Sequence, residues 1–304
     1  MKLIIMGSGT SFGVPVIGCH CPVCTSKDFR DRRYRASCYI TNRDEKESEN
    51  FVPLDIVIDT GPEFRLQALE NNIERLDAVF ITHPHADHLH GLDDLRRFSC
   101  IKPKMSGLKS DPPLPVYANK KTVSDIKIKF DYVFTEVKEG GGKPNLLLND
   151  VSKYSEQNPL VIKNLMCVPL LLRHGLMSDC GWLLSHISKD NKKHSVAYLT
   201  DCNFIPMQTL KIIEENAGIL DTVVIDALRE QSHSTHFSFF KALSMANILG
   251  AKNTFFTHMT HDKSHIQVQQ YIDEHLCEFE NLSLIVKSGG RVEPSYDGLE
   301  IEMF

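Results

Sequence analysis

The segment His83-Pro84-His85-Ala86-Asp87-His88 places four potential metal ligands within six residues. It follows the apolar run 78–82, so a buried strand should deliver these side chains onto a turn, where a rigid scaffold can hold them. In an extended segment His83 and His85 point to the same side, whereas Asp87 and His88 turn away to a second position. By chance, three histidines and one acid at this spacing should occur about 0.004 times in a chain of this composition. The segment therefore predicts two neighbouring metal sites, with one ligand pair for each.

A second group of ligand-type residues is Cys19, Cys21 and Cys24, in a tight turn that contains Pro22. Three thiolates around one point suit a tetrahedral zinc ion, whose fourth ligand must then come from elsewhere in the chain. The alternative is a set of reduced cysteines without metal. The sequence gives less support to a redox role, because the motif is not a single C-x-x-C beside a thioredoxin-like unit.

The His-x-His-x-Asp-His segment resembles the signature of the metallo-β-lactamase superfamily. The cysteine trio together with Thr257-His258-Met259-Thr260-His261 resembles the branch that contains the phosphoribosyl 1,2-cyclic phosphate phosphodiesterase of the carbon–phosphorus lyase pathway. The resemblance covers nearly the whole chain. It implies an α/β fold, a four-layer αβ/βα sandwich with two sheets between helices, which would bring ligands far apart in the sequence to one rim.

The resemblance also implies a complete set of metal ligands, several of which follow predicted strands. One metal would be held by His83, His85 and His174, the other by Asp87, His88 and His258, with Asp201 bridging both. His261 would complete a structural Zn²⁺ site with Cys19, Cys21 and Cys24. Mixed imidazole and carboxylate ligands suit Mn²⁺, Zn²⁺ or Fe²⁺ as the two catalytic ions, and the sequence does not choose among them.

Three further polar residues have an expected role near the metals. The resemblance implies that His236 is a catalytic histidine outside the metal shell, able to give a proton to the leaving oxygen. Asp87, a ligand of the second metal, is also expected to be catalytic. Its neighbour His233 would either share this role or only support it by hydrogen bonding. Asp59 would either accept a hydrogen bond from a metal-bound histidine or cap the helix that begins near Pro62.

Apolar periodicity predicts alternating strands and helices along one domain spanning 1–304. Strands are expected at 2–6, 35–40, 54–58, 78–82, 116–118, 170–174, 196–200, 222–226, 254–257 and 282–287, and helices at 64–72, 92–98, 120–130, 239–249 and 264–277. Surface insertions are expected near 41–53 and 139–159, the second of them flexible. The glycines at 7–13 differ in spacing from a dinucleotide-binding G-x-G-x-x-G, and Pro15 interrupts the helix that should follow. They are better explained by backbone passing close to the active site.

Composition limits the kinds of molecule that the protein can be expected to bind. The 304 residues are 42% hydrophobic, enough for a substantial core. Their formal charge of −5 differs from the excess of positive charge that is typical of proteins that bind long nucleic acids. No apolar run approaches the roughly 20 residues of a membrane span. The apolar run at the start of the sequence is too short for the core of a signal peptide. Nine cysteines, an odd number, favour reduced thiols or metal ligation. We expect a soluble, cytoplasmic or also nuclear protein that acts on a small substrate, alone or as a homodimer.

The expected function is a dinuclear metal-dependent phosphodiesterase. A water whose pKa the two metals lower would attack the phosphorus of a small or cyclic phosphodiester. One alternative is an RNase Z-like endoribonuclease, because such enzymes share the metal segment and a sequence like His233-Ser234-Thr235. Another is a non-catalytic metal-binding protein on the same fold, which predicts that ligands are missing.

Overall fold

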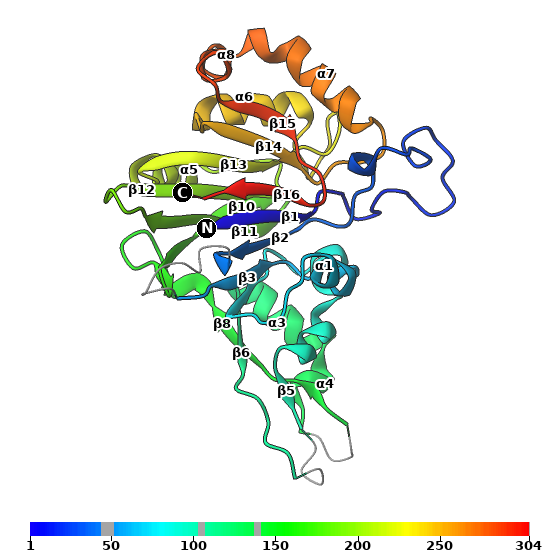
Figure 1. Ribbon diagram of the computed structural model, residues 1–304, viewed down its shortest axis with the longest axis vertical. Coiled ribbons are helices and arrows are strands. Elements are labelled where there is room, and N and C mark those ends of the chain that lie inside the picture. The colour runs from blue at the N-terminus through cyan, green and yellow to red at the C-terminus, as the bar shows by residue number, and fades with distance from the viewer. Residues whose placement is uncertain (44–51, 103–106, 137–140, 304) are drawn as a thin grey trace.

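The computed structural model describes residues 1–43, 52–102, 107–136 and 141–303. Two seven-stranded sheets face each other, and helices cover the outer face of each (Figure 1). A small third sheet pairs β5 (Cys100–Ile101) with β7 (Lys143–Pro144). The order of helix, sheet, sheet and helix confirms the predicted four-layer αβ/βα sandwich.

The first sheet holds the amino-terminal half of the chain together with the last strand. Its strands, in spatial order, are β16 (Leu299–Glu302), β1 (Lys2–Gly7), β2 (Ser37–Thr41), β3 (Asp55–Ile58), β4 (Ala78–Phe80), β6 (Leu114–Ala118) and β8 (Leu146–Asp150). Because β3, β4 and β6 run parallel, the residues that follow β3 and β4 lie at the same edge. Asp59 and His83 are therefore neighbours.

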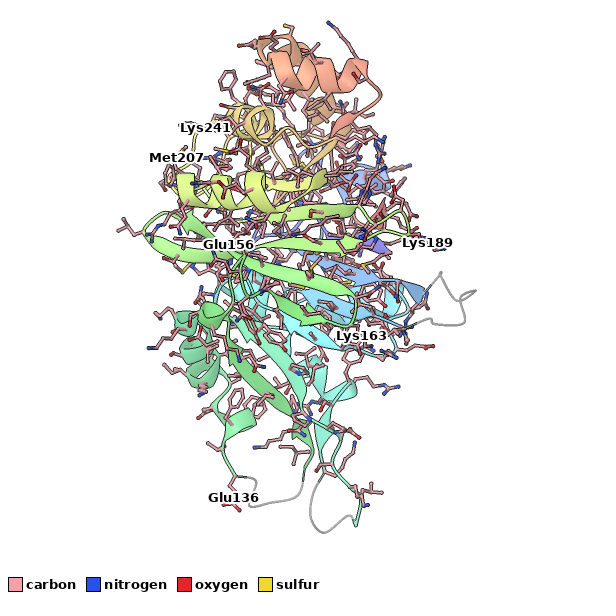
Figure 2. The ribbon with its side chains drawn as sticks, turned by 90° about the vertical axis from the view of Figure 1, so that its left-hand side faces the viewer. Glu136, Glu156, Lys163, Lys189, Met207 and Lys241 are labelled. Atoms are coloured by element: carbon pink, nitrogen blue, oxygen red, sulfur yellow. The ribbon has the colours of Figure 1, made fainter. Side chains whose placement is uncertain are left out.

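The second sheet brings four further strand ends to one edge. Its strands, in spatial order, are β15 (Arg291–Pro294), β14 (Asn253–Thr257), β13 (Ile219–Asp226), β12 (Lys193–Leu199), β11 (Met177–Ile187), β10 (Leu165–His174) and β9 (Leu160–Ile162). Strands β12, β13 and β14 are parallel, and β11 is antiparallel to both β10 and β12. The carboxyl ends of β10, β12, β13 and β14 therefore point the same way. Figure 2 marks the turns at the opposite end with Lys163 and Lys189.

Three hydrophobic clusters fill the spaces between the layers. The cluster between the two sheets contains Trp182 stacked on Phe80, with ring centroids 4.1 Å apart. A second cluster packs the outer face of the first sheet against α1 (Phe64–Glu70), the 3-10 helix η3 (Leu92–Arg97), α3 (Lys120–Lys129) and α4 (Asp131–Phe134). The third packs the second sheet against α5 (Met207–Asn216), α6 (Phe239–Leu249), α7 (His265–His275) and α8 (Glu280–Lys287).

Helix α6 shows how the sequence sets an element of the outer layer. Its buried residues Phe239, Ala242, Leu243 and Ala246 recur at helical spacing and form one apolar stripe. The Ser238 side chain caps the first turn by accepting from the Lys241 amide, and Gly250 ends the helix with a φ of 66°. The predicted bounds of this helix are confirmed.

Two predictions about elements are wrong. The run 282–287 is not a strand but most of α8, which packs on α6, and the closing strands are β15 and β16. A short apolar run cannot by itself distinguish a strand from a helix, and Leu282, Ile285 and Val286 have helical spacing. The described part of 139–159 is not a flexible insertion, because it contributes β8, which pairs in parallel with β6.

Residues 44–51 of the expected insertion at 41–53 lie outside the described residues. The segment 92–98 is helical as predicted, but as the 3-10 helix η3. Among the described helices, none is both long and apolar enough to cross a membrane.

Candidate metal centre

The turn after β4 carries the four residues of the His-x-His-x-Asp-His segment. It continues into the single-turn helix α2 (Ala86–Leu89), with His85 at its N-cap. The turn packs tightly against the segment after β3, because a Cβ at Gly61 would lie 2.2 Å from the Asp87 carbonyl oxygen. His83 and His88 are fully buried, and His83 Nε2 lies 3.0 Å from His85 Nδ1. The first predicted ligand pair therefore converges on one point.

His174, at the end of β10, joins His83 and His85. The ligand atoms of these three histidines lie within 4.8 Å of one another. His174 Nδ1 donates to the Thr235 carbonyl oxygen at 2.9 Å, which leaves Nε2 free to face the site. Burial lowers the pKa of all three imidazoles, so they are held neutral, the form that binds a cation.

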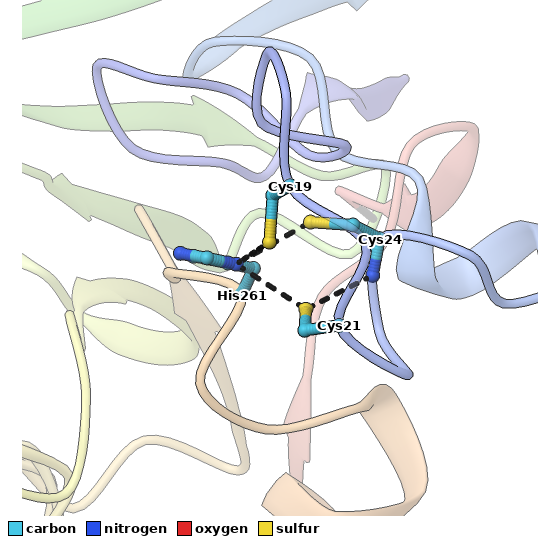
Figure 3. A group of neighbouring side chains, drawn as sticks. All are labelled: Cys19, Cys21, Cys24 and His261. Carbon is cyan, nitrogen blue, oxygen red and sulfur yellow. Dashed lines mark hydrogen bonds between the residues drawn. The ribbon is translucent and has the colours of Figure 1, made fainter.

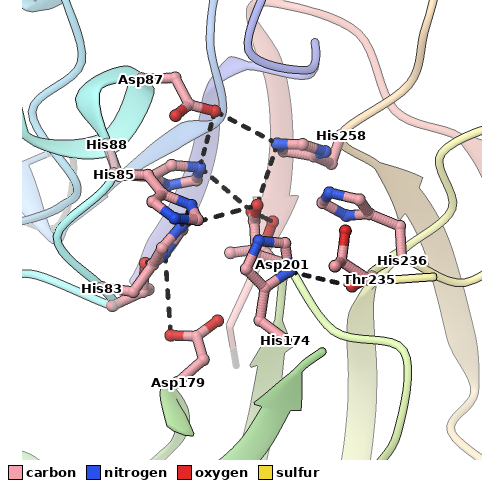
Figure 4. Close-up of polar contacts among 12 residues, drawn as sticks. His83, His85, Asp87, His88, His174, Asp179, Asp201, Thr235, His236 and His258 are labelled. Carbon is pink, nitrogen blue, oxygen red and sulfur yellow. Dashed lines mark hydrogen bonds and ion pairs between the residues drawn. The ribbon is translucent and has the colours of Figure 1, made fainter. Parts of the chain in front are cut away.

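Asp87, His88, Asp201 and His258 form the second group, again with ligand atoms within 4.8 Å of one another (Figure 4). Asp201 Oδ2 lies 3.1 Å from His88 Nε2, and Asp201 Oδ1 lies 3.1 Å from His258 Nε2. The same Oδ1 is 3.9 Å from His83 Nε2. Asp201 therefore lies beside both groups, as the predicted bridging residue should.

Asp59 supports this arrangement from behind. Its Oδ2 accepts hydrogen bonds from His88 Nδ1 at 2.7 Å and from the Thr82 hydroxyl at 2.8 Å. The Thr82 hydroxyl is in turn 3.0 Å from His83 Nδ1. Of the two roles considered for Asp59, the structure shows the hydrogen bond to a candidate ligand. The residue at the N-cap of α1 is Glu63, not Asp59.

His236 faces the same centre and is held by Asp226. Its Nδ1 lies 3.2 Å from both carboxylate oxygens of Asp226, and the Phe237 amide donates to Asp226 Oδ2 at 2.9 Å. Burial alone would lower the pKa of His236, but Asp226 outweighs it and raises the pKa to about 9. His233 is exposed, and its Nδ1 lies 3.1 Å from the Thr235 hydroxyl, so it supports this loop.

The centre is strongly acidic for a buried site. Five of its carboxylates are buried: Asp59, Asp87, Asp179, Asp201 and Asp226. Within the described residues, none of them forms an ion pair with lysine or arginine, and histidines are their only cationic partners. Burial opposes ionisation of Asp87 and Asp201, but His88 and His258 outweigh it and lower the pKa of both. Burial and the nearby Asp201 raise the pKa of Asp179.

These features fit divalent cations. His88 Nε2 and His258 Nε2 are buried, face carboxylate oxygens, and have no hydrogen-bond partner in the described part of the chain. A buried nitrogen that neither donates nor accepts is costly unless a cation shares its lone pair. The donor set of imidazoles and carboxylates suits Mn²⁺, Zn²⁺ or Fe²⁺.

Sequence reasoning missed Asp226, Asp179 and Thr82. Asp226 ends β13 just as Asp201 follows β12, so the pattern of an acid at a strand end could have revealed it. Asp179 lies opposite Leu172 in the β10–β11 hairpin, and its Oδ1 is 3.9 Å from His83 Nδ1. Only the register of that hairpin places it beside His83 in the candidate centre, and no local signal in the sequence does so.

The cysteine trio also converges with its predicted partner. His261 Nδ1 lies 3.3–3.4 Å from the Sγ atoms of Cys19, Cys21 and Cys24 (Figure 3). The Cys24 amide donates to Cys21 Sγ and, with the nearby His261, lowers the pKa of Cys21 to about 6. All nine cysteines are free thiols. Three sulfurs and one imidazole nitrogen facing one point match a structural zinc site.

Comparison with known proteins identifies the class of protein. The profile of the beta-lactamase superfamily domain matches residues 55–259. The chain therefore belongs to the beta-lactamase superfamily, whose members with this fold include metal-dependent hydrolases.

A solved relative narrows the branch. The crystal structure of a diphosphatase from the PhnP family is 32% identical, covers 100% of this chain and 98% of its own, and superposes with a TM-score of 0.73. This similarity confirms the branch predicted from the cysteine trio and the Thr-His-x-x-His segment.

Other relatives are more distant or longer. Zn²⁺-bound PqqB from Methylobacterium extorquens (15% identity, TM-score 0.69, 100% of both chains) and a long form RNase Z from yeast (10% identity, TM-score 0.60, 99% of this chain and 41% of the other) share the fold. An octanoyltransferase of Porphyromonas gingivalis is 32% identical over 301 residues, 99% of this chain. The chain spans about half the length of that curated relative, 51% of it.

Proposed function

We propose that this protein is a dinuclear metal-dependent phosphodiesterase that acts on a small or cyclic phosphodiester. The observation that carries the proposal is the pair of ligand groups that meet at Asp201, in a centre whose five buried carboxylates, Asp87 and Asp201 among them, form no lysine or arginine ion pair in the described structure. The two carboxylates among the proposed ligands, Asp87 and Asp201, have lowered pKa values and are ionised, so they and the imidazoles around them can hold two divalent cations. Buried ionised carboxylates without a cation beside them are strongly unfavourable.

The proposed division of ligands follows the geometry. His83, His85 and His174 would hold one cation, Asp87, His88 and His258 the other, and Asp201 would contact both. When bound, such cations supply Lewis acidity toward phosphoryl oxygens and lower the pKa of a water. The cysteine site would hold a separate structural Zn²⁺.

The remaining chemistry belongs to the protein. The Phe237 amide donates a hydrogen bond to Asp226 and so fixes the position of this carboxylate. Asp226 in turn accepts from Nδ1–H of His236 and keeps the imidazole facing the centre. The Nε2 of His236 is then available to carry a proton to the leaving oxygen. Asp226 raises the pKa of His236 to about 9, which favours the protonated state that a general acid requires.

Two observations support a small phosphate substrate. The full-length relative in the PhnP family is a diphosphatase, and the net charge of −5 disfavours a long polyanion. That relative also favours a second candidate, hydrolysis of a diphosphate. The solved RNase Z is 10% identical and shares the fold, so the comparison with it says nothing about substrate. The octanoyltransferase is a protein about twice as long.

The test is to purify the protein without chelator, count its metals by elemental analysis, and assay bis-p-nitrophenyl phosphate, ribose cyclic phosphates and inorganic diphosphate with added Mn²⁺ or Zn²⁺. About three metals per chain with turnover of a diester is the expected result. Turnover of diphosphate alone would favour the second candidate. One zinc per chain and no turnover after addition of Mn²⁺ would contradict the proposal and favour a non-catalytic metal-binding protein.

A further inference from the structure

The turn after β14 carries a residue of each metal site. His258 faces Asp201 in the catalytic centre, and His261, three residues later, faces the cysteine trio. His258 has a φ of 62°, in the left-handed region. This conformation costs a non-glycine residue about 1–2 kcal/mol, so the surrounding structure must impose it.

Backbone hydrogen bonds hold the beginning of this turn from two sides. The Met259 amide donates to the Ser8 carbonyl at 2.9 Å, and the Thr10 amide donates to the Met259 carbonyl at 3.2 Å. The Thr260 amide donates to the Leu228 carbonyl at 3.0 Å. These contacts fix residues 259 and 260. They do not involve the carbonyl groups of Thr260 and the residues after it, which need other hydrogen-bond donors.

Arg33 supplies those partners. Its guanidinium donates to the Thr260 carbonyl through one Nη and to the Lys263 carbonyl through the other, at 3.0 Å for the second. Arg33 is only 1% exposed, and its Nε has no hydrogen-bond partner among the described residues. The one carboxylate that forms an ion pair with it in the described structure, Asp31, is 3.8 Å away, and Asp297 acts on it from a greater distance. Burying a guanidinium with so little compensation is costly. Both of its hydrogen bonds serve the one turn that carries His258 and His261.

The chain also makes room for this arginine. A Cβ at Gly9 would lie 2.8 Å from Arg33 Cβ and 2.8 Å from the Arg33 carbonyl oxygen. The absence of a side chain at residue 9 therefore lets the segment that carries Arg33 pass against the segment that binds Met259. The glycine-rich stretch after β1 thus helps to position this turn.

We propose that Arg33 is a positioning residue that, together with the occupied cysteine site, holds His258 in its metal-binding orientation. Zinc bound at the cysteines would fix His261. Arg33 fixes the carbonyl groups of Thr260 and Lys263, which lie before and after His261. Because the turn is short, these two supports leave His258 one conformation. Loss of either support would release the left-handed backbone and move Nε2 away from Asp201. The His83, His85 and His174 group lies on other segments and would keep its affinity.

This inference rests on the two-cation site proposed above, and calorimetric titration with Mn²⁺ tests it. Protein freed of catalytic cations but retaining its zinc should show two binding steps, and the step lost in His258→Ala identifies the affected site. Arg33→Met is expected to weaken that same step about 10- to 100-fold, the usual effect of removing an outer support of a ligand, and to leave the other step unchanged. His261→Ser should give the same pattern.

The matched control is Arg30→Met. Arg30 lies three residues before Arg33, is partly exposed and pairs with Asp28, so its loss should change neither step. If Arg33→Met folds poorly, Arg33→Lys, which can reach one carbonyl, should give an intermediate weakening. Equal weakening of both steps, or two unchanged steps, in Arg33→Met would overturn the inference. Wild-type protein with two Mn²⁺ steps but no phosphoryl substrate would instead refute the proposed function and leave the inference standing.

Discussion

His88 Nδ1 donates to Asp59 Oδ2 over 2.7 Å, while the other nitrogen of the same ring faces Asp201 at 3.1 Å. One buried carboxylate thus fixes which nitrogen of His88 faces the candidate cation. Through the Thr82 hydroxyl, the same carboxylate also reaches His83 of the other group. Asp59 therefore supports a ligand in each half of the centre, although it belongs to neither.

Replacing Asp59 by Asn should weaken cation binding about 10- to 100-fold. Asn keeps the size of the side chain and tolerates the left-handed backbone at this position, where φ is 65°, so the main change is the loss of charge behind His88. The measurement is a Mn²⁺ titration of the variant. Asp55→Asn, at the start of the strand that precedes Asp59, changes a carboxylate that pairs with Arg43 and Arg75. It should lower stability but leave cation affinity unchanged. Equal affinities for wild type and Asp59→Asn would contradict the orienting role.

His236→Ala should retain both cations and lose roughly 10²- to 10⁴-fold in turnover, the usual contribution of a general acid or base. Elemental analysis and steady-state kinetics on a diester check the two halves of this expectation. His233→Ala is the control, because His233 is exposed and contacts Thr235 rather than Asp226. The ligand atoms of His236 lie within 4.8 Å of those of His174 and Asp201. A loss of one catalytic cation in His236→Ala would therefore show that His236 is a ligand.

His261→Ser should remove one zinc per chain. Three partly buried thiols would then share no cation, and the binding free energy that zinc contributes to folding would be lost. We expect the melting temperature to fall by about 5 °C or more. Elemental analysis with differential scanning calorimetry measures both effects. The neighbouring change His20→Ser, in the same cysteine turn but outside the ligand group, should alter neither. An unchanged zinc count in His261→Ser would rule out the structural site.

The stability of the fold should depend on pH through His265, the first residue of α7. Burial, and then the charges of Arg30 and Arg33, lower its pKa from 6.5 to about 4. Between these values the unfolded chain binds a proton on His265 that the folded chain excludes, so the free energy of unfolding should fall as pH is lowered from about 6.5 to 4. The expected loss is about 2 kcal/mol, from roughly 1.4 kcal/mol per pKa unit discounted for partial solvation.

Urea unfolding of wild type and His265→Gln across this range isolates the effect, because acid release of zinc would be common to both proteins. The wild type should lose stability relative to the variant as pH falls below about 6.5. A constant difference between the two across that range would show that His265 is not held neutral by the fold.

Much of the centre could be predicted from the sequence, because its ligands follow apolar strands. In a sheet whose strands run parallel, residues such as Asp201 and His258 come after strands that end at the same edge, so a local pattern carries long-range information. The segment from His83 to His88 is informative by itself. The cysteine trio required a fourth ligand, and the resemblance supplied His261.

The rest depended on tertiary contacts that no local pattern encodes. Asp179 acts behind His83 only because the β10–β11 register places it there. The segment 282–287 was predicted as a strand because its apolar residues were considered without α6, the helix that buries them. Arg33 looks like one of several arginines in a basic stretch, and only the fold shows that its guanidinium is buried against the turn of His258.

Asp59, Asp201 and His258 share an unusual property: each follows a strand with a left-handed backbone, at φ values of 65°, 53° and 62°. Glycine at any of these positions would adopt that backbone without the steric cost. The same positions carry buried side chains that contact one another across the centre, so glycine there would relieve the backbone but remove those hydrogen bonds and the cation binding that they support. Engineering of this scaffold for heat resistance should therefore leave these three residues unchanged and seek stability at other positions.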